Sequence, residues 1–133
     1  MHIGVVEDNP AVLSMIEMAL ALYGHSVETY SSSASFLSAL EKSERIPPYD
    51  LVLVDLFLDE RSGTDLIEAL GSHTTLSPGS PPQVIKAILI SAAEESVLTP
   101  IRKRYPNLPI LRKPFKVQEL VSLVSKVTSS TEA

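Results

Sequence analysis

Five side chains that can bind a metal ion or a phosphate fall where predicted strands end. Glu7 and Asp8 follow the first apolar run, Asp55 ends the third, Ser91 follows the fourth and Lys113 follows the fifth. Taken one at a time, each has an ordinary explanation, such as a helix cap or a solvated charge. Together, three carboxylates need a nearby cation, because two like charges about 4 Å apart repel by about 4 kcal/mol at an effective dielectric near 20.

Lys113 supplies one positive charge to this group. The remaining negative charge fits a hard divalent ion, Mg²⁺ or Mn²⁺, because such ions prefer carboxylate and carbonyl oxygens and keep water positions that a phosphate can take. We therefore expect a metal ion and a phosphoryl group at this place, provided that the fold brings the strand ends together.

The elements that must position these residues are short apolar runs that alternate with segments of helical period, which is the pattern of an α/β domain. The predicted strands are residues 3–6, 26–30, 51–56, 84–90 and 108–111. Helices are predicted for 10–24, after the serines at 31–33, from Gly63 onward, between the last two strands, and for 117–127. Asn9 is the expected N-cap of the first helix and Pro10 its first residue.

Parallel strands joined by right-handed crossovers predict a doubly wound sheet of five strands with helices on both faces. In such a sheet, ligands bind at the carboxyl ends of the strands, near the point where the strand order reverses. Glu7, Asp8, Asp55, Ser91 and Lys113 are therefore expected to converge at one edge of the sheet.

Composition excludes several other classes of protein. The chain has 133 residues and no cysteine, which is enough for one core without disulfides and rules out a cysteine-stapled secreted scaffold. Its 11 basic and 16 acidic residues give a net charge of −5, the wrong sign for direct binding of nucleic acid. No apolar run approaches the roughly 20 residues that span a membrane, so we expect a cytoplasmic location. The expected domain is 1–127, with a flexible tail or the start of a linker at 128–133.

The same residues, in the same order, resemble the receiver domain of two-component response regulators over essentially the whole chain. The resemblance is carried by Glu7-Asp8, Asp55, Gly63, Ser91 and Lys113-Pro114-Phe115. It implies a flavodoxin-like sheet with the strand order 2-1-3-4-5 and a phosphorylation-activated signalling switch. Such a switch is not an enzyme but a phosphoacceptor regulatory domain that assists its own phosphotransfer and dephosphorylation. Asp55 would be the phosphoacceptor, which takes a phosphoryl group from the phosphohistidine of a histidine kinase or phosphotransfer protein and becomes an acyl phosphate.

The resemblance also implies roles for the residues around the phosphoacceptor. Asp8, Asp55 and the backbone carbonyl of Phe57 would bind Mg²⁺ (or Mn²⁺) directly, and Glu7 would reach the ion mainly through water. The ion and Lys113 would neutralise charge on the transferring oxygens, which is most of what catalysis of phosphoryl transfer requires.

Three further positions bear on the switch that the resemblance implies. Ser91 would donate its hydroxyl to a phosphoryl oxygen after transfer and so pull the following loop inward. Ile110 stands three residues before the lysine, where the family has a Tyr or Phe that swings between exposed and buried positions, so that movement cannot occur here. Pro114 would follow a cis peptide bond that holds the Lys113 backbone in a tight turn.

Other segments depart from a simple pattern. Asp59 and Glu60 make the rim of the site unusually acidic, either as solvated charges or as groups that tune metal affinity. Pro100 falls inside the fourth predicted helix, which should therefore start late or kink. The basic run at 102–104 is better explained as a solvated helix face than as a surface for an acidic partner. Residues 73–83 are expected to form a long loop within the domain.

Two rival interpretations remain open. A pseudo-receiver, which keeps the fold as a binding module without phosphorylation, is disfavoured by the intact set of site residues. A haloacid-dehalogenase-like phosphatase needs a second acid two residues after its Asp nucleophile, where this chain has Phe57. The expected partners are a kinase or phosphotransfer protein and an output domain or a second receiver. Both a stand-alone regulator and a receiver within a longer chain fit the sequence, and the latter is slightly favoured.

Overall fold

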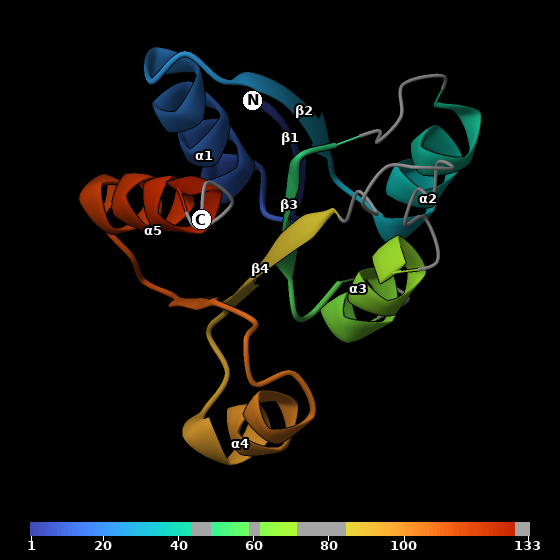
Figure 1. Cartoon of the computed structure of the whole chain (residues 1–133), viewed down its shortest axis with the longest axis vertical. Coiled ribbons are helices and arrows are strands. Elements are labelled where there is room, and N and C mark those ends of the chain that lie inside the picture. Colours follow the sequence, from blue (N-terminus) through green and yellow to red (C-terminus); the bar gives the residue numbers. More distant parts are fainter. Residues whose placement is uncertain (44–48, 59–61, 72–84, 130–133) are drawn as a thin grey trace, which may run out of the picture.

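Strands and helices alternate along the chain in the computed structural model, which describes residues 1–43, 49–58, 62–71 and 85–129 (Figure 1). The strands are β1 (His2–Val6), β2 (Ser26–Tyr30), β3 (Leu51–Asp55), β4 (Lys86–Ser91) and β5 (Ile110–Arg112). The helices are α1 (Pro10–Leu22), α2 (Ser33–Lys42), α3 (Gly63–Gly71), α4 (Glu95–Arg104) and α5 (Val117–Ser129). Within these ranges, no helix is both long enough and apolar enough to cross a membrane.

The strands form one parallel sheet in the order β2-β1-β3-β4-β5, which confirms the predicted doubly wound topology. β1 pairs with β2 on one side and with β3 on the other, so the strand order reverses at β1. β3 is buried at every residue, as expected for a strand that is covered on both faces. The carboxyl ends of β1 and β3 therefore meet where ligands bind in open α/β sheets.

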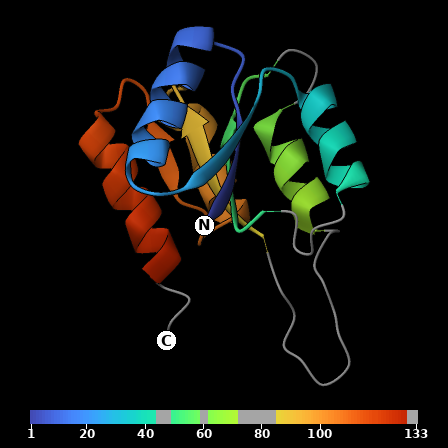
Figure 2. The same cartoon turned by 90° about the horizontal axis from the view of Figure 1, so that it is seen from above.

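Two layers of helices cover the sheet (Figures 1 and 2). On one face, α1 and α5 pack Ile16, Leu20 and Leu120 against side chains of β1, β3, β4 and β5. On the other face, α2 and α3 cover β3 with a cluster that includes Phe36 and Leu66. The helix α4 joins this second layer through a separate cluster of buried apolar residues, Leu56, Leu89, Ala93 and Leu98.

The first helix begins and ends as its residue types predict. The side chain of Asn9 accepts hydrogen bonds from the backbone N–H groups of Ala11 and Val12, and Pro10 is the first helical residue. Gly24 has a φ of +86°, and its N–H donates to the carbonyl of Ala21 at 3.0 Å. A glycine at this position takes the left-handed conformation without strain and ends the helix.

Of the two outcomes expected from Pro100, a late start of the fourth helix is wrong, and a kink stays a prediction. The helix begins at Glu95 and contains Pro100 in its interior. Pro100 cannot donate to the carbonyl of Ser96, but both residues lie on the exposed side of the helix, where water can take that place. The next turn is intact, since the N–H of Tyr105 donates to the carbonyl of Ile101 at 2.8 Å.

The other differences from the sequence-based boundaries are small. The strand β5 starts at Ile110 instead of residue 108, because Pro109 has no N–H and contributes only its carbonyl, which accepts from Leu89 at 3.0 Å. β4 runs from Lys86 to Ser91, and α5 continues two residues beyond the expected end at Val127. Asp59, Glu60 and the expected loop at 73–83 lie outside the described residues, as does the end of the chain from 130 onward.

Candidate functional site

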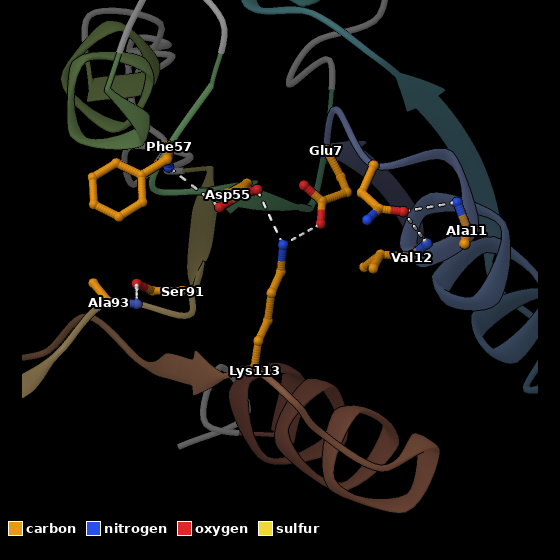
Figure 3. Close-up of polar contacts among 9 residues, drawn as sticks. Glu7, Ala11, Val12, Asp55, Phe57, Ser91, Ala93 and Lys113 are labelled. Carbon is orange, nitrogen blue, oxygen red and sulfur yellow. Dashed lines mark hydrogen bonds and ion pairs between the residues drawn. The ribbon is translucent and has the colours of Figure 1, made fainter.

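Three carboxylates meet at the carboxyl ends of β1 and β3. One side-chain oxygen from each of Glu7, Asp8 and Asp55 lies within 4.8 Å of the others. Glu7 and Asp55 are buried, whereas Asp8 is exposed at the rim. Figure 3 shows the Glu7 and Asp55 side chains on either side of the amine of Lys113. The convergence expected from the strand order is therefore present in the structure.

The backbone around Asp55 is held by a glycine. Gly63, the first residue of α3, donates its N–H to the carbonyl of Leu56 at 2.8 Å. A Cβ added to Gly63 would lie 2.3 Å from the carbonyl oxygen of Asp55, far inside van der Waals contact. Only glycine lets the start of α3 approach the end of β3 this closely, so Gly63 helps to set the position of the Asp55 side chain.

Lys113 connects the end of β5 to the carboxylates. Its amine donates to Oδ2 of Asp55 at 3.1 Å and makes a second, short hydrogen bond to Oε1 of Glu7. Its backbone N–H donates to the carbonyl of Ser91 at 2.8 Å, which ties the ends of β4 and β5 together. The peptide bond between Lys113 and Pro114 is cis. Lys113 thus lies among the acidic groups, where the sequence analysis expected its positive charge.

The electrostatics of the site follow from this crowding. Burial, and next the neighbouring Asp55 carboxyl, raise the pKa of Glu7 to about 7, although Lys113 opposes the shift. Burial alone would lower the pKa of Lys113, but its hydrogen bonds to Glu7 and Asp55 outweigh that effect and raise the pKa above its ordinary value. One ammonium therefore does not fully compensate the buried carboxylates, and the site has capacity for a further cation.

The donor set fits a hard divalent cation. Oε2 of Glu7 is buried and has no hydrogen-bond partner among the described residues, which is costly for a carboxylate oxygen that no cation or water contacts. Three carboxylates that converge from two strand ends provide the oxygen ligands that Mg²⁺ and Mn²⁺ prefer, and the exposed side of Asp8 leaves room for water ligands. The residues present are thus compatible with the ion that the sequence predicts.

Ser91 lies buried at the end of β4, next to the carboxylate cluster. Its Oγ accepts a hydrogen bond from the N–H of Ala93 at 2.9 Å (Figure 3). Because a hydroxyl both accepts and donates, this contact leaves the Ser91 proton available for another acceptor. The hydroxyl of Ser91 can therefore still act as a hydrogen-bond donor.

Arg112 is a residue that the sequence analysis did not single out. Its Nη2 donates to the carbonyl of Ala93 at 3.0 Å, and its Nη1 donates to Oε1 of Glu95, the first residue of α4. Ala93 is therefore held at its carbonyl by Arg112 and bonded through its N–H to Ser91. An arginine after a short apolar strand gives no signal of this contact, which depends on how β5 lies beside the loop that follows β4.

Phe57 and Ile110 flank the site in different ways. The backbone N–H of Phe57 donates to Oδ1 of Asp55 at 3.2 Å, while the residue is 58% exposed and its ring extends away from the carboxylates (Figure 3). Ile110 is partly buried and packs against the cluster that contains Leu98 of α4. An aliphatic side chain wedged there cannot provide the aromatic swing that the resemblance would otherwise imply.

Comparison with known proteins agrees with the fold and identifies the family. The chain matches the model of the response regulator receiver domain over residues 3–125, and it belongs to that family. It is 29% identical over 122 residues to the probable transcriptional regulatory protein TcrX of Mycobacterium tuberculosis, covering 88% of this chain and 45% of the relative. It is 25% identical over 130 residues to the DNA-binding transcriptional regulator NtrC of Azospirillum brasilense, covering 95% of this chain and 24% of the relative.

Solved structures show the same fold. A CheY-like receiver domain protein from Methanospirillum hungatei superimposes with a TM-score of 0.78 at 21% identity, with 98% of this chain and 95% of that chain covered. NtrX from Brucella abortus also gives a TM-score of 0.78, at 20% identity, with 98% of this chain but only 27% of that chain covered. The chain thus spans less than half of the length of the curated relatives just named. It is a regulatory signalling domain of the two-component type.

Proposed function

We propose that Asp55 of this receiver domain accepts a phosphoryl group from the phosphohistidine of a histidine kinase or phosphotransfer protein. The observation that carries the proposal is the position of the Asp55 carboxylate at the end of a buried strand, where it accepts a hydrogen bond from the amine of Lys113 and lies within 4.8 Å of oxygens of the other two acids. An oxygen of Asp55 attacks the phosphorus, the P–N bond to the donor histidine breaks, and the imidazole leaves with its electron pair. The product is an acyl phosphate on Asp55.

The residues around Asp55 then act mainly by position and charge. Asp8, Asp55 and the carbonyl of Phe57 would hold Mg²⁺ (or Mn²⁺), with Glu7 reaching it through water; when bound, the ion withdraws charge from the transferring oxygens. The amine of Lys113 already contacts Oδ2 of Asp55, so it is placed to bond to an oxygen of the incoming group. Fixed charges of this kind stabilise the transition state without having to reorganise.

Phosphorylation would reach the surface through the loop after β4. Ser91 can donate a hydrogen bond from its hydroxyl to a phosphoryl oxygen. An inward movement of this loop would shift Ala93, which is hydrogen-bonded to both Ser91 and Arg112. Arg112 also contacts Glu95, so the start of α4 is connected to the same path. We propose that α4 is the part of the surface that responds, and that Arg112 carries the coupling that Ile110, standing in the place of an aromatic residue, cannot provide.

The kinase or phosphotransfer protein would dock where its histidine can reach Asp55. An apolar hollow of about 320 Å³ lies beside Lys113, between α1 and the segment that joins β5 to α5. It is lined by Val12, Met15, Ala92, Lys113, Pro114 and Phe115. An apolar side chain of the donor that entered it would lie close to the phosphoryl acceptor.

The partner that receives the signal is a further proposal. It would be an output domain or a second receiver, and this domain would not itself bind nucleic acid. A cytoplasmic location stays a prediction.

The proposal is tested by the mass of the intact protein after incubation with acetyl phosphate. With Mg²⁺ present we expect a gain of one phosphoryl group, and with EDTA in its place we expect little or none. A pseudo-receiver would gain no phosphoryl group in either condition, and that result would overturn the proposal. Continuous release of phosphate from unrelated phosphate esters would favour the phosphatase instead.

A further inference from the structure

A groove follows the outer edge of β2 and has no role in the site described above. It has a volume of about 730 Å³, and its lining includes the four consecutive β2 residues 27–30. Because successive side chains of a strand point to opposite faces of a sheet, a hollow that all four line must follow the open edge of the strand. Glu17 of α1 lines it on one side of the sheet and Lys42 of α2 on the other (Figures 1 and 2).

The edge of β2 carries backbone groups that pair with no described strand. The N–H of Ser26 donates to the carbonyl of Met1 at 2.9 Å, so Ser26 and the residues at steps of two from it pair with β1. The residues between them, Val27 and Thr29, direct their N–H and carbonyl groups to the other side. β2 is the last strand on that side of the sheet in the part of the chain that the structure describes. An edge of this kind is a template for an added strand.

The carboxylate of Glu28 is held in a fixed position within this groove. Its Oε2 accepts hydrogen bonds from the hydroxyls of Tyr30 at 2.9 Å and Tyr49 at 3.2 Å, and it lies 3.7 Å from Nε2 of His2. Its Oε1 has no hydrogen-bond partner among the described residues, and the side chain is 51% exposed. One oxygen is therefore oriented in advance and open to a ligand, which reduces the entropy that binding would cost.

The aromatic wall of the groove depends on Gly4. This glycine stands opposite Glu28 in the register of β1 and β2, and a Cβ on it would lie 3.1 Å from the ring of Tyr49. Without that Cβ, Tyr49 lies across β1, stacks on His2 with ring centroids 5.3 Å apart and reaches Glu28. Tyr49 is only 2% exposed, and burial raises its pKa, so its hydroxyl stays a neutral donor.

We propose that this groove, the open edge of β2 with Glu28, Tyr30 and Tyr49, binds an extended peptide segment of a partner protein and places a lysine or arginine of that segment against Glu28. Main-chain hydrogen bonds to Val27 and Thr29 would supply the affinity, and the carboxylate would select the side chain. Carboxylate oxygens and tyrosine rings are groups that attract ammonium and guanidinium ions.

The charges around the groove favour a basic segment over other occupants. Glu17 and Glu28 outnumber Lys42, and Lys42 is the last residue of α2, where the helix carbonyls partly offset its charge. The net charge of −5 also attracts a basic partner. A second copy fits less well, because two β2 strands paired edge to edge would bring the two Glu28 carboxylates to one edge, where like charges repel.

The groove is separate from the proposed phosphorylation site. β2 contributes no residue to the carboxylate cluster or to the path from Ser91 to α4. Asp55→Asn should therefore bind the segment like the wild type. The peptide proposal can fail while Asp55 is the phosphoacceptor, and it can hold if Asp55 is not.

Fluorescence polarisation of a labelled peptide of about eight residues, in which lysine alternates with valine, tests the proposal on the chain as it stands. In low salt, binding should saturate by about 1 mM protein. Glu28→Gln should weaken binding about tenfold, because a bond to a charged group is lost. Glu41→Gln is the matched control, since Glu41 is an exposed acid of α2 outside the groove lining, and it should bind like the wild type. Lys42→Gln should bind more tightly.

Strand pairing is tested separately from charge. The same peptide with N-methylated backbone amides keeps its lysines but loses its N–H donors, so it should bind at least tenfold more weakly. In NMR spectra, the unmodified peptide should shift the amide resonances of Val27 and Thr29 more than those of other residues. Spermidine, a small polyamine, should not displace the peptide at the same concentration.

Each contrary result overturns the proposal. Equal weakening by Glu28→Gln and Glu41→Gln would mean unspecific attraction, and equal binding of the N-methylated peptide would mean that no strand is added. Displacement by spermidine would assign the groove to small amines. An absence of binding at 1 mM, or tighter binding of a peptide with glutamate in place of lysine, would contradict a basic occupant. The amide oxygen in Glu28→Gln still accepts from both tyrosines, so circular dichroism should find this variant folded, and its gain of a phosphoryl group should match the wild type.

Discussion

The guanidinium of Arg112 donates a 3.0 Å hydrogen bond to the carbonyl oxygen of Ala93, and the N–H of the same Ala93 donates to Oγ of Ser91 at 2.9 Å. A residue at the end of β5 is thereby connected to the hydroxyl that we expect to contact a phosphoryl group. The same arginine contacts Glu95 at the start of α4, so one side chain bridges the site and the responding helix.

Removing this bridge should weaken the response of α4 more than the stability of the fold. Arg112→Ala loses partly exposed contacts, so we expect the free energy of unfolding to fall by less than about 1 kcal/mol. Phosphorylation of Asp55 should continue, but the changes that it causes in the amide chemical shifts of residues 93–99 should shrink by at least half. Arg102→Ala is the control, because Arg102 also contacts Glu95, at 3.2 Å, but has no bond to Ala93. Equal responses in the two variants would contradict a bridging role for Arg112.

Asp8 should be needed for the effect of Mg²⁺ on stability. An ion that binds only the folded state stabilises it by mass action, by about 2.7 kcal/mol at a concentration one hundred times the dissociation constant. We expect Mg²⁺ to raise the melting temperature of the wild type by several degrees and to raise that of Asp8→Ala much less. Asp8 is exposed, so the variant should fold normally. Glu17→Ala, which removes an exposed acid on α1 away from the cluster, should keep the full effect; an equal shift in Asp8→Ala would place the ion elsewhere.

The stability of the metal-free protein should depend on pH through Glu7. Its pKa is about 7 in the fold and 4.5 ordinarily, so the folded state holds a proton that the unfolded chain releases. For a raised pKa, the stabilising contribution is complete below the unfolded value and is lost as the pH rises through the folded one. Between about pH 5 and 8, this group should lower the free energy of unfolding in EDTA by roughly 1 to 3 kcal/mol. Urea titrations of Glu7→Gln should show a flatter pH dependence, and an unchanged slope would count against the assignment.

The lifetime of the acyl phosphate should depend on Phe57. In receivers, the side chains two residues after the phosphoacceptor and two after the serine flank the approach of water, and here these are Phe57 and Ala93. Neither side chain can orient a water molecule, so we expect slow hydrolysis. Phe57→Asn should release phosphate several times faster than the wild type at fixed Mg²⁺, whereas Val97→Asn, at an exposed apolar position on α4, should not. Phe57 is 58% exposed, so its side chain could leave the phosphate open to water. In that case Phe57→Asn and the wild type will release phosphate at the same rate, and the argument from Phe57 is wrong.

Much of the fold could be predicted because local signals and topology agree. The cap formed by Asn9 and Pro10, the buried run that ends at Asp55 and the alternation of strands and helices predict the elements and a doubly wound parallel sheet. Once that order is known, parallel pairing brings strand ends that are far apart in sequence to one edge. This is why Glu7, Asp55 and Lys113 could be expected to meet.

The remaining features depend on contacts that no local pattern encodes. The bonds of Arg112 to Ala93 and Glu95 arise from the packing of β5 beside the β4–α4 loop, and an arginine in a sequence has many possible partners. The late start expected for α4 was wrong because Pro100 is exposed, where water can replace the helical hydrogen bond that a proline cannot make. The apolar run that ends at Tyr23 predicts a helix but does not tell which of its side chains lie outside the core.

Phosphorylation of Asp55 is tested most directly by comparing intact masses after treatment with acetyl phosphate and Mg²⁺. The wild type should gain one phosphoryl group and Asp55→Asn none, while Asp65→Asn, which makes the same change on an exposed part of α3, should gain one like the wild type. In EDTA, Asp55→Asn should melt at the same temperature as the wild type or higher, because one of the crowded carboxylates is gone. A folded Asp55→Asn that still gains a phosphoryl group would contradict the assignment of Asp55 as the phosphoacceptor.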